Sequence, residues 1–313
     1  MLNTVTQTVQ EKYNVPWSCM RPEVRTYSGN NSSVNKEFEE LLLKNNIKYI
    51  REFVLGNYSY DFKVDDVLIE INPTITHNTL FSPYGEHKGI DKDYHLNKTL
   101  CAINNGYQCI HVWDWDDKTK IINLLLTKQS IYARNCVIKE ANEKECNEFL
   151  NTCHLQNSCK GQIIRLGLYY DGELVQIMTF GQPRYNKKYE WELLRLCTKS
   201  QYKVIGGSEK LFKYFVTFYR PTSIISYCDD SKFVGNVYSK LGFTKLRLAK
   251  PSKHWYSIKT KQHITDNLLR QRGFDQLFGT SFGKGTNNEE LIINNGFYPV
   301  YDCGQSTYIF KNN

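Results

Sequence analysis

The 313-residue sequence lacks several features that would assign it to a special class of protein. It has no apolar run that approaches the roughly 20 residues of a membrane helix, and its first residues, "MLNTVTQTVQEKYN", lack the apolar segment of a signal peptide. Its ten cysteines include no CxxC pair, which favours reduced thiols over a zinc site or a disulfide framework. It also has no internal repeat and no low-complexity tract. We therefore expect a folded cytoplasmic protein of two or three domains, without a membrane partner.

Acidic residues are scarce in the second part of the chain. Residues 1–130 contain 14 Lys and Arg against 16 Asp and Glu, whereas residues 131–313 contain 26 against 16. Within 240–272 there are nine Lys and Arg and one acid, Asp266. A solvated surface usually mixes both signs, so this bias favours a polyanionic partner over an ordinary basic surface. We expect double-stranded DNA to be contacted by Lys245, Arg247, Lys250, Lys253, His254, Trp255, Lys259 and Lys261.

The front part of the chain predicts a compact α/β domain. An amphipathic helix is expected within 36–47, two β-rich runs within 49–74, a helix over 94–105 and a strand over 108–115. In the second helix Leu96, Leu100 and Ile103 form an apolar side, and Gly106 ends it.

One acid lies inside an apolar strand of this domain. Glu70 is flanked by Leu68, Ile69 and Ile71, and burying a charge without a partner is costly. A divalent cation shared with Asp61 of the preceding run would compensate it, and the carboxylates would leave coordination positions for water and phosphate. The other interpretation places Asp61 in a turn and pairs Glu70 with a nearby lysine.

Further polar residues lie near this acid pair. His77 follows the strand and could act as a general base, because its unperturbed pKa is near neutrality. His95 and Lys98 are one helical turn apart, and Glu37 could approach from the first helix.

Residues 33–117 resemble the PD-(D/E)xK nuclease superfamily, in the branch of the very-short-patch-repair endonucleases and the EDxHD homing endonucleases of phages. The resemblance is carried by "NKEFEELLLKNNIKY", "YDFKV", "VLIEIN", "PTITHN" and "YHLNKTLCAINNGYQCIHVWDWD". It implies that Asp61 and Glu70 bind Mg²⁺ or Mn²⁺, that His77 assists proton transfer and that Glu37 is the acid of the first helix. Asn72 stands where the family has a lysine. The resemblance therefore implies that Lys98 or His77 takes over the role of that positive charge. His95 completes the expected catalytic set.

The second half predicts another α/β domain and resembles the GNAT acyltransferase fold, in a version found in Mom-type DNA-modification proteins. A strand and a helix are expected within 135–154, and a hairpin over 163–181 turns at Asp171-Gly172. The resemblance is carried by "YEWELLRLCTKSQYKVIGGSEKLFKYF" and "SKFVGNVYSKLGF". In an active member the turn "KVIGGS" would present backbone N–H groups to the pyrophosphate of coenzyme A. The other interpretation is a scaffold that grips DNA.

These observations predict the following α/β organisation: an N-terminal arm over 1–32, a PD-(D/E)xK-like nuclease core over 33–130, a GNAT-like domain over 134–258 and a small α+β extension over 259–313. The expected activity is metal-dependent hydrolysis of DNA phosphodiester bonds by a homing-type endonuclease. The alternative is an acyl-CoA-dependent transferase that modifies DNA bases, with acetyl-CoA as cofactor and the front domain as DNA binder. A third possibility is a DNA-binding protein without catalysis.

Overall fold

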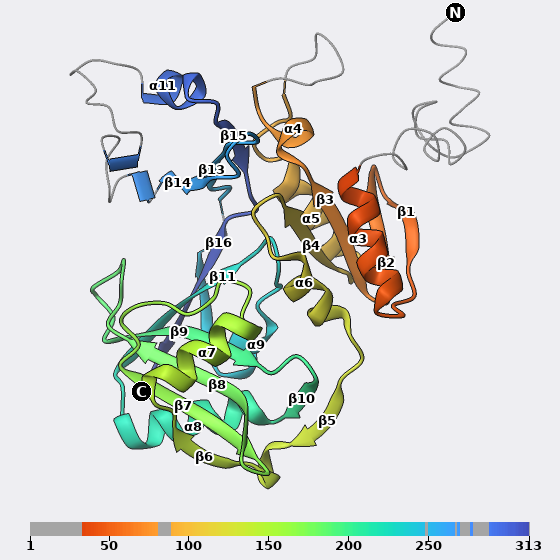
Figure 1. The fold of residues 1–313 in the computed structure, drawn as a ribbon. Coiled ribbons are helices and arrows are strands. Elements are labelled where there is room, and N and C mark those ends of the chain that lie inside the picture. Colours follow the sequence, from red (N-terminus) through yellow and green to blue (C-terminus); the bar gives the residue numbers. More distant parts are fainter. Residues whose placement is uncertain are drawn as a thin grey trace, which may run out of the picture. The chain divides into compact units, whose positions relative to one another are not determined.

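The computed structural model describes residues 33–80, 89–247, 250–266, 268–269, 276–277 and 288–312. The expected N-terminal arm over 1–32 lies outside these residues. The chain divides into two compact units (Figure 1), with Met1–Asp116 and Pro251–Gly304 in unit 1 and Asp117–Lys250 and Gln305–Asn313 in unit 2. No helix in the described part of the chain is both long and apolar enough to span a membrane.

Unit 1 is built on a four-stranded sheet in the order β1-β2-β3-β4. Its elements are α3 (Ser33–Lys44), β1 (Ile50–Leu55), β2 (Tyr58–Val64), β3 (Val67–Asn72), α4 (Thr74–His77), α5 (Tyr94–Asn104) and β4 (Gln108–Trp113). The first three strands are antiparallel and β4 lies parallel to β3. Phe38 of α3 is fully buried, and its ring centroid lies 5.8 Å from that of Phe62 on β2. Helix α3 thus closes one part of the core.

Helix α5 buries a polar face. Its buried residues are His95, Lys98, Thr99 and Ala102, whereas Leu100 is 42% exposed. The sequence pattern indicated a neighbouring face, on which Leu96 and Ile103 are only half-buried, because it counted apolar side chains and not the hydrogen bonds that satisfy buried polar ones. Tyr60 on β2, for example, donates its hydroxyl to the backbone oxygen of Lys98 at 2.7 Å.

The later part of unit 1 adds a three-stranded antiparallel sheet in the order β14-β13-β15. Its elements are β13 (Lys253–Tyr256), β14 (His263–Thr265), α11 (Asn288–Asn294) and β15 (Tyr298–Tyr301). Trp255, Ile264, Ile292 and Phe297 form its core. The backbone N–H of Thr79, which follows α4, donates to the oxygen of Pro299 on β15 at 3.1 Å. This sheet therefore belongs to the same body as the first helices and strands.

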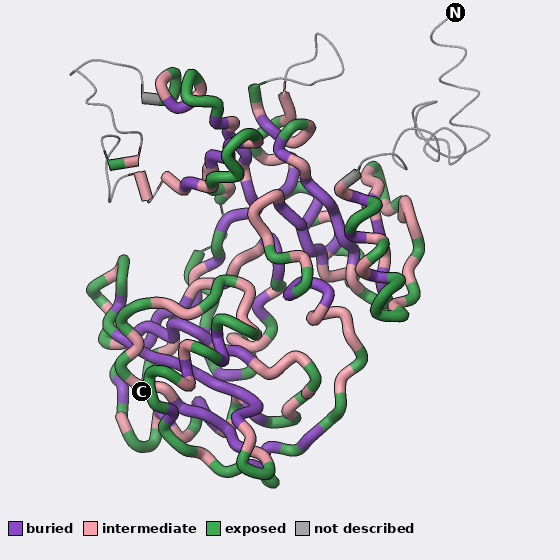
Figure 2. The backbone as a smooth tube through the Cα atoms, in the orientation of Figure 1, coloured by how far each residue is buried: buried purple, intermediate pink, exposed green. Residues whose placement is uncertain are grey.

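Unit 2 is built on a seven-stranded sheet in the order β12-β16-β11-β9-β8-β7-β6. Its elements are α6 (Lys118–Leu125), β5 (Gln129–Tyr132), η2 (Ala133–Asn135), β6 (Val137–Glu140), α7 (Glu143–Cys153), β7 (Ile164–Tyr170), β8 (Glu173–Gly181), β9 (Trp191–Thr198), β10 (Tyr202–Ile205), α8 (Gly207–Tyr219), β11 (Ser223–Asp229), α9 (Asn236–Lys240), β12 (Thr244–Arg247) and β16 (Gln305–Lys311). One hydrophobic cluster packs with α8 and another with α7. The central strands β7, β8, β9 and β11 are mostly buried, whereas the edge strands β6 and β12 contain no buried residue (Figure 2).

The hairpin expected over 163–181 is present as β7 and β8. Asp171 and Gly172 have φ angles of 48° and 82°. These positive angles are those that a tight two-residue hairpin turn requires.

The division of the chain differs from the expected one at both ends of the second domain. Helix α6 and strand β5 belong to unit 2, so unit 1 ends its first segment at Asp116 and not near 130. The expected extension over 259–313 is divided, because residues up to Gly304 belong to unit 1 and β16 lies between β11 and β12 of unit 2. This pairing is nonlocal, so the sequence pattern did not indicate it.

Candidate functional site

Unit 1 gathers the predicted polar residues around Glu70. Asp61 on β2 accepts hydrogen bonds from the backbone N–H of Ile71 at 2.7 Å and from the side-chain amide of Asn35 at 3.0 Å. Glu70 on β3 forms an ion pair with the Lys98 ammonium, which is 2% exposed. The second carboxylate oxygen of Glu70 is buried without a hydrogen-bond partner. Lys98 therefore provides the compensating charge for Glu70, as in the alternative that pairs Glu70 with a nearby lysine and not with a metal ion.

Burial controls the protonation of these acids. Burial raises the pKa of Glu70 to about 8, while the Lys98 ammonium acts in the opposite direction. Burial also raises the pKa of Asp61, while the Lys98 ammonium again lowers it. Burial therefore outweighs the Lys98 ammonium, so Glu70 loses its proton and completes the ion pair only as the pH approaches 8.

Two histidines extend the cluster. His95 Nδ1 lies 2.7 Å from the backbone oxygen of Tyr301, and its Nε2 lies 3.0 Å from His77 Nδ1. Because a backbone oxygen only accepts, His95 carries its proton on Nδ1, and its Nε2 accepts from the Nδ1–H of His77. Burial lowers the pKa of His95 to about 3 and that of His77 well below its usual value. Both rings are neutral near pH 7.

These residues do not fit the expected Mg²⁺ or Mn²⁺ site. Both carboxylate oxygens of Asp61 accept hydrogen bonds from the protein, and Glu70 is paired with Lys98. In the part of the chain that the structure describes, no three His, Cys, Asp or Glu side chains are grouped to hold an ion. Glu37 is exposed on α3, and Asn35 of the same helix is the residue that reaches Asp61.

The residues expected to contact DNA belong to both units. Lys245, Arg247 and Lys250 are exposed in unit 2, whereas Lys259 and Lys261 are exposed in unit 1.

Three other residues that were expected to contact DNA instead contact residues of unit 1. Trp255 is 1% exposed and belongs to a core, so it offers no ring face to a base. His254 hydrogen-bonds to Asp302 at 2.9 Å and to His263 at 2.8 Å. Lys253 forms an ion pair with Glu289. The composition of the stretch did not distinguish these residues from exposed ones.

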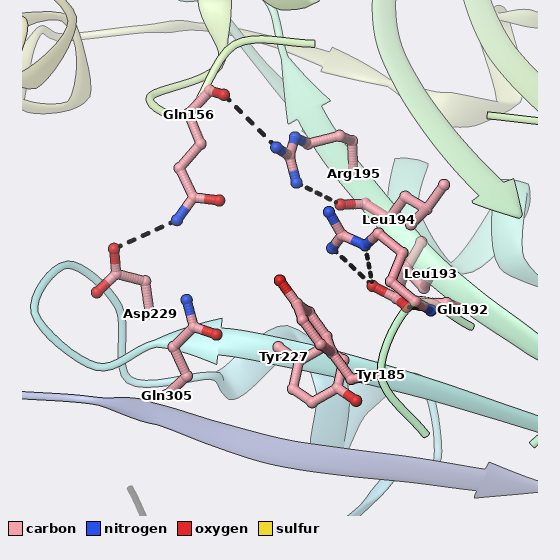
Figure 3. A pocket seen from close by; sticks show the side chains of 10 residues that line it. Gln156, Tyr185, Glu192, Leu193, Leu194, Arg195, Tyr227, Asp229 and Gln305 are labelled. Carbon is pink, nitrogen blue, oxygen red and sulfur yellow. Dashed lines mark hydrogen bonds and ion pairs between the residues drawn. The ribbon is translucent and has the colours of Figure 1, made fainter. Parts of the chain in front are cut away.

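Unit 2 contains a pocket that the sequence analysis did not predict. Strands β9 and β11 pair in parallel at only two positions, Ile224 with Trp191 and Ile225 with Glu192. Beyond these positions the hydroxyl of Ser226 donates to the backbone oxygen of Leu193 at 2.9 Å. A pocket of about 150 Å³ opens here (Figure 3), lined by Gln156, Arg184, Tyr185, Glu192, Leu193, Leu194, Arg195, Tyr227, Asp229 and Gln305.

Two arginines in the pocket wall are held differently. Arg184 donates to Glu192 through Nε at 2.9 Å and Nη2 at 2.6 Å, and its backbone N–H donates to the same carboxylate at 2.7 Å. Arg195 donates to backbone oxygens of Asn157 and Leu194, both at 2.9 Å, and of Gln156 at 3.5 Å. Glu192 and Arg195 interrupt an apolar strand, as Glu70 does, so the same signal could have indicated them.

The expected Gly-rich turn precedes α8. Gly206 has a φ of 75°, and helix α8 starts at Gly207. A Cβ atom on Gly207 would lie 2.1 Å from the side-chain oxygen of Gln176, so no larger residue fits there without movement. The turn thus ends in a helix N-terminus, where free backbone N–H groups favour anions.

No family model matches the sequence, and no curated protein matches it. Among solved structures, the chain is similar to a Bacillus subtilis acetyltransferase in complex with CoA (12% identity, 57% of this chain and 99% of that one, TM-score 0.33). It is also similar to a GNAT family acetyltransferase from Streptococcus pneumoniae (14% identity, 56% and 99%, TM-score 0.32). A GNAT family acetyltransferase from Elizabethkingia anophelis with acetyl-CoA bound gives 10% identity, 57% and 99% coverage and a TM-score of 0.30.

The predicted metal-dependent DNA endonuclease finds no support in these comparisons, because the similar proteins are acetyltransferases and not DNA hydrolases.

Proposed function

We propose that unit 2 transfers an acyl group from an acyl-CoA to an amine. The observation that carries this proposal is the separation of β9 from β11 at the pocket, because it leaves room between two strands of a continuous sheet. A register shift in the pairing of β8 with β9 falls beside Leu194 at the same place. Such irregularities redirect backbone groups and are common next to active sites.

The turn before α8 supports the same proposal. The N-terminus of this 13-residue helix would hold the pyrophosphate of CoA through backbone N–H groups, with Gly206 in the left-handed conformation that the turn requires. Lys210 does not take part, because its ammonium donates to the backbone oxygens of Ala133 and Cys136. When bound, the thioester would supply the activated acyl group.

Thermal unfolding of the full chain with and without acetyl-CoA tests the proposal. Acetyl-CoA at 100 times its dissociation constant should stabilise the folded protein by about 2.7 kcal/mol. Ser208→Glu should abolish this stabilisation, because it places a negative charge in the first turn of α8, where the pyrophosphate would bind. The same charge favours the helix N-terminus by ~0.3–1 kcal/mol, so folding is preserved. The control Lys144→Glu changes the first turn of α7 and should leave acetyl-CoA binding unchanged. No stabilisation of the unaltered chain by CoA or acetyl-CoA would refute the proposal.

We also propose DNA as a partner of the exposed basic residues of unit 2. Lys245, Arg247 and Lys250 are exposed and follow one another around β12. Their replacement by Gln should weaken binding of a labelled duplex, measured by fluorescence anisotropy, and should reduce the dependence of affinity on salt. The matched control replaces the exposed Lys139, Lys144 and Lys160. Equal effects of both triple variants would contradict a specific role of the β12 region.

A further inference from the structure

Strands β5 and β10 form a two-stranded parallel sheet that leads into helix α8 (Figure 1). Ile205, the last residue of β10, pairs with Tyr132 of β5, and Gly206 alone separates it from α8. A Cβ atom on Gly206 would lie 3.8 Å from the Cβ atom of Ala133. Lys210 of α8 also donates to the backbone oxygen of Ala133, at 2.8 Å. The end of β5 is therefore fixed next to the turn that precedes α8.

This small sheet has one buried face and one exposed face. Ile131 is buried and Val204 is partly buried in the hydrophobic cluster that packs with α8. Side chains alternate between the two faces along a strand, so Tyr132, Ile205 and Lys203 lie on the other face. Tyr132 is 48% exposed and Ile205 is 40% exposed, and Lys203 is also exposed. The exposed face thus presents an aromatic ring beside an aliphatic side chain.

Two cations border this apolar pair. The guanidinium carbon of Arg134 lies 4.9 Å from the centroid of the Tyr132 ring, and Lys203 is two residues before Ile205 on the same face. Both cations are exposed, and neither forms an ion pair with an acid in the described part of the chain. The first turn of α8 contains a single acid, Glu209. The surface around the turn therefore favours a negatively charged ligand.

The shape and charge of this face fit one end of coenzyme A. CoA carries a flat adenine base and a 3′-phosphate on one ribose, and its pyrophosphate is attached to the same ribose. The proposed function places the pyrophosphate at the first turn of α8, directly after Gly206. The ribose then lies next to the end of β10, where an aromatic ring and two cations are exposed. Bases stack on aromatic side chains, and arginine binds phosphate through parallel N–H groups.

We propose that the exposed face of β5 and β10 binds the adenosine 3′-phosphate of CoA, with the adenine on Tyr132 and Ile205 and the 3′-phosphate against Arg134 and Lys203. This inference rests on the proposed function, which supplies the position of the pyrophosphate. It also defines the class of acyl donor. Unit 2 uses acyl groups carried by free CoA and discriminates against acyl groups on the phosphopantetheine of a carrier protein, which has neither the adenine nor the 3′-phosphate.

Calorimetry on the full chain tests the two contacts with three ligands: CoA, 3′-dephospho-CoA and 4′-phosphopantetheine. We expect 3′-dephospho-CoA to bind about 10-fold more weakly than CoA, because it loses the charged hydrogen bonds of the 3′-phosphate. We expect 4′-phosphopantetheine to bind at least about 10-fold more weakly again, because it also loses base stacking and one phosphate of the pyrophosphate. All titrations use the same ionic strength, because salt weakens contacts between exposed charges.

Variants separate the contact with the base from the contact with the phosphate. Arg134→Gln combined with Lys203→Gln should bind CoA about 10-fold more weakly and should leave the affinity for 3′-dephospho-CoA unchanged, so that the two ligands bind equally. Tyr132→Ser should weaken the binding of CoA and of 3′-dephospho-CoA by the same factor, about 10-fold, and should leave the binding of 4′-phosphopantetheine unchanged.

The matched control is Lys213→Gln combined with Lys240→Gln, which removes two exposed cations from helices α8 and α9. It should keep the preference for CoA over 3′-dephospho-CoA. Thermal unfolding shows which variants are folded. The ratio of the two affinities within one variant does not depend on the fraction of folded protein, so it carries the test even for a destabilised variant.

The outcomes distinguish this inference from the proposed function. If none of the three ligands binds, both are refuted. Equal affinity of the unaltered chain for CoA and 3′-dephospho-CoA agrees with the proposed function and overturns the adenosine site. A preference for CoA that survives the double change at Arg134 and Lys203, or that disappears in the control, also overturns the adenosine site.

Discussion

At the residue scale, the buried acid of unit 1 makes stability depend on pH above neutrality. Burial raises the folded-state pKa of Glu70 to about 8, above the value of a free glutamate. A raised folded-state pKa stabilises the protein below the unfolded pKa, and this contribution is lost as pH rises towards 8. Between pH 6.5 and 8.5 the contribution of Glu70 to the free energy of unfolding should fall by about 2 kcal/mol. Urea unfolding across this range measures the change.

The control for this prediction removes the titrating group. Glu70→Gln keeps the shape of the side chain, and its free energy of unfolding should fall by about 2 kcal/mol less than that of the unaltered chain from pH 6.5 to 8.5, whatever its absolute value. An alkaline loss of the same size in the variant would assign the effect to another group.

The histidine pair has the opposite effect below neutrality. Burial lowers the pKa of His95 to about 3 and lowers that of His77. A base with a lowered folded-state pKa stabilises the protein above its unfolded pKa of about 6.5, and this contribution is lost as pH falls. We expect His95→Gln to be less stable than the unaltered chain at pH 7. Between pH 6.5 and 4.5, however, its free energy of unfolding should fall by about 1–3 kcal/mol less than that of the unaltered chain. Parallel curves for the two proteins would contradict this.

At the same scale, the sequence showed which residues of unit 1 are unusual but not what compensates them. Asp61, Glu70, His77, His95 and Lys98 were detectable because charged or polar groups interrupt apolar patterns, and the structure brings them together. Asn35 gave no such signal, because an amide at the start of a helix is ordinary. The pocket of unit 2 was missed because Asp229 and Gln305 reach it from strands whose neighbours depend on the sheet order.

At the scale of elements, strand β16 is held against α9 through a close contact between a glycine and a tyrosine. Gly235, the N-cap of α9, has a φ of 83°, and a Cβ atom on it would lie 2.3 Å from the hydroxyl of Tyr308 on β16. The Tyr308 ring stacks on Tyr238 of α9, with centroids 4.4 Å apart. The fit of β16 in the sheet therefore depends on the absence of a side chain at position 235.

Alanine substitution tests this contact with a matched control. Gly161→Ala has the same kind of backbone, with a φ of 82° and no atom within 4 Å of the added Cβ, and should cost about 1–2 kcal/mol. Gly235→Ala should cost about 1–3 kcal/mol more, because Tyr308 must move. The difference between the two variants in urea unfolding isolates the contact. Equal costs would mean that Tyr308 shifts without penalty.

The local elements were largely predictable and their pairing was not. The Asp171-Gly172 turn fixes a hairpin from two neighbouring residues. Strand β16 instead pairs with β11 and β12, which precede it by more than 50 residues. A periodic pattern indicates that such a segment is a strand but contains no information on its neighbours.

At the scale of the whole molecule, segment 251–304 of unit 1 is inserted between two adjacent strands of unit 2. Strands β12 and β16 are antiparallel neighbours, with Arg247 paired to Thr307. A short turn could therefore join them directly, as in an ordinary hairpin.

Removing the insertion tests whether unit 2 is independent. A chain of residues 117–250, a four-residue Gly and Ser linker and residues 305–313 should fold cooperatively in urea and keep the acetyl-CoA binding proposed for unit 2. The control ends at residue 250 and lacks β16, and it should be unstable because β11 loses its antiparallel partner. Failure of the linked chain to fold, with the full chain intact, would show that unit 2 depends on unit 1.

This insertion also affects synthesis on the ribosome. When the first 250 residues have emerged, unit 1 still lacks its three-stranded sheet, and the large sheet of unit 2 still lacks the strand between β11 and β12. Until residues 251–313 have also emerged, strands β11 and β12 of the nascent polypeptide therefore lack the strand that lies between them, and unit 1 lacks its second sheet.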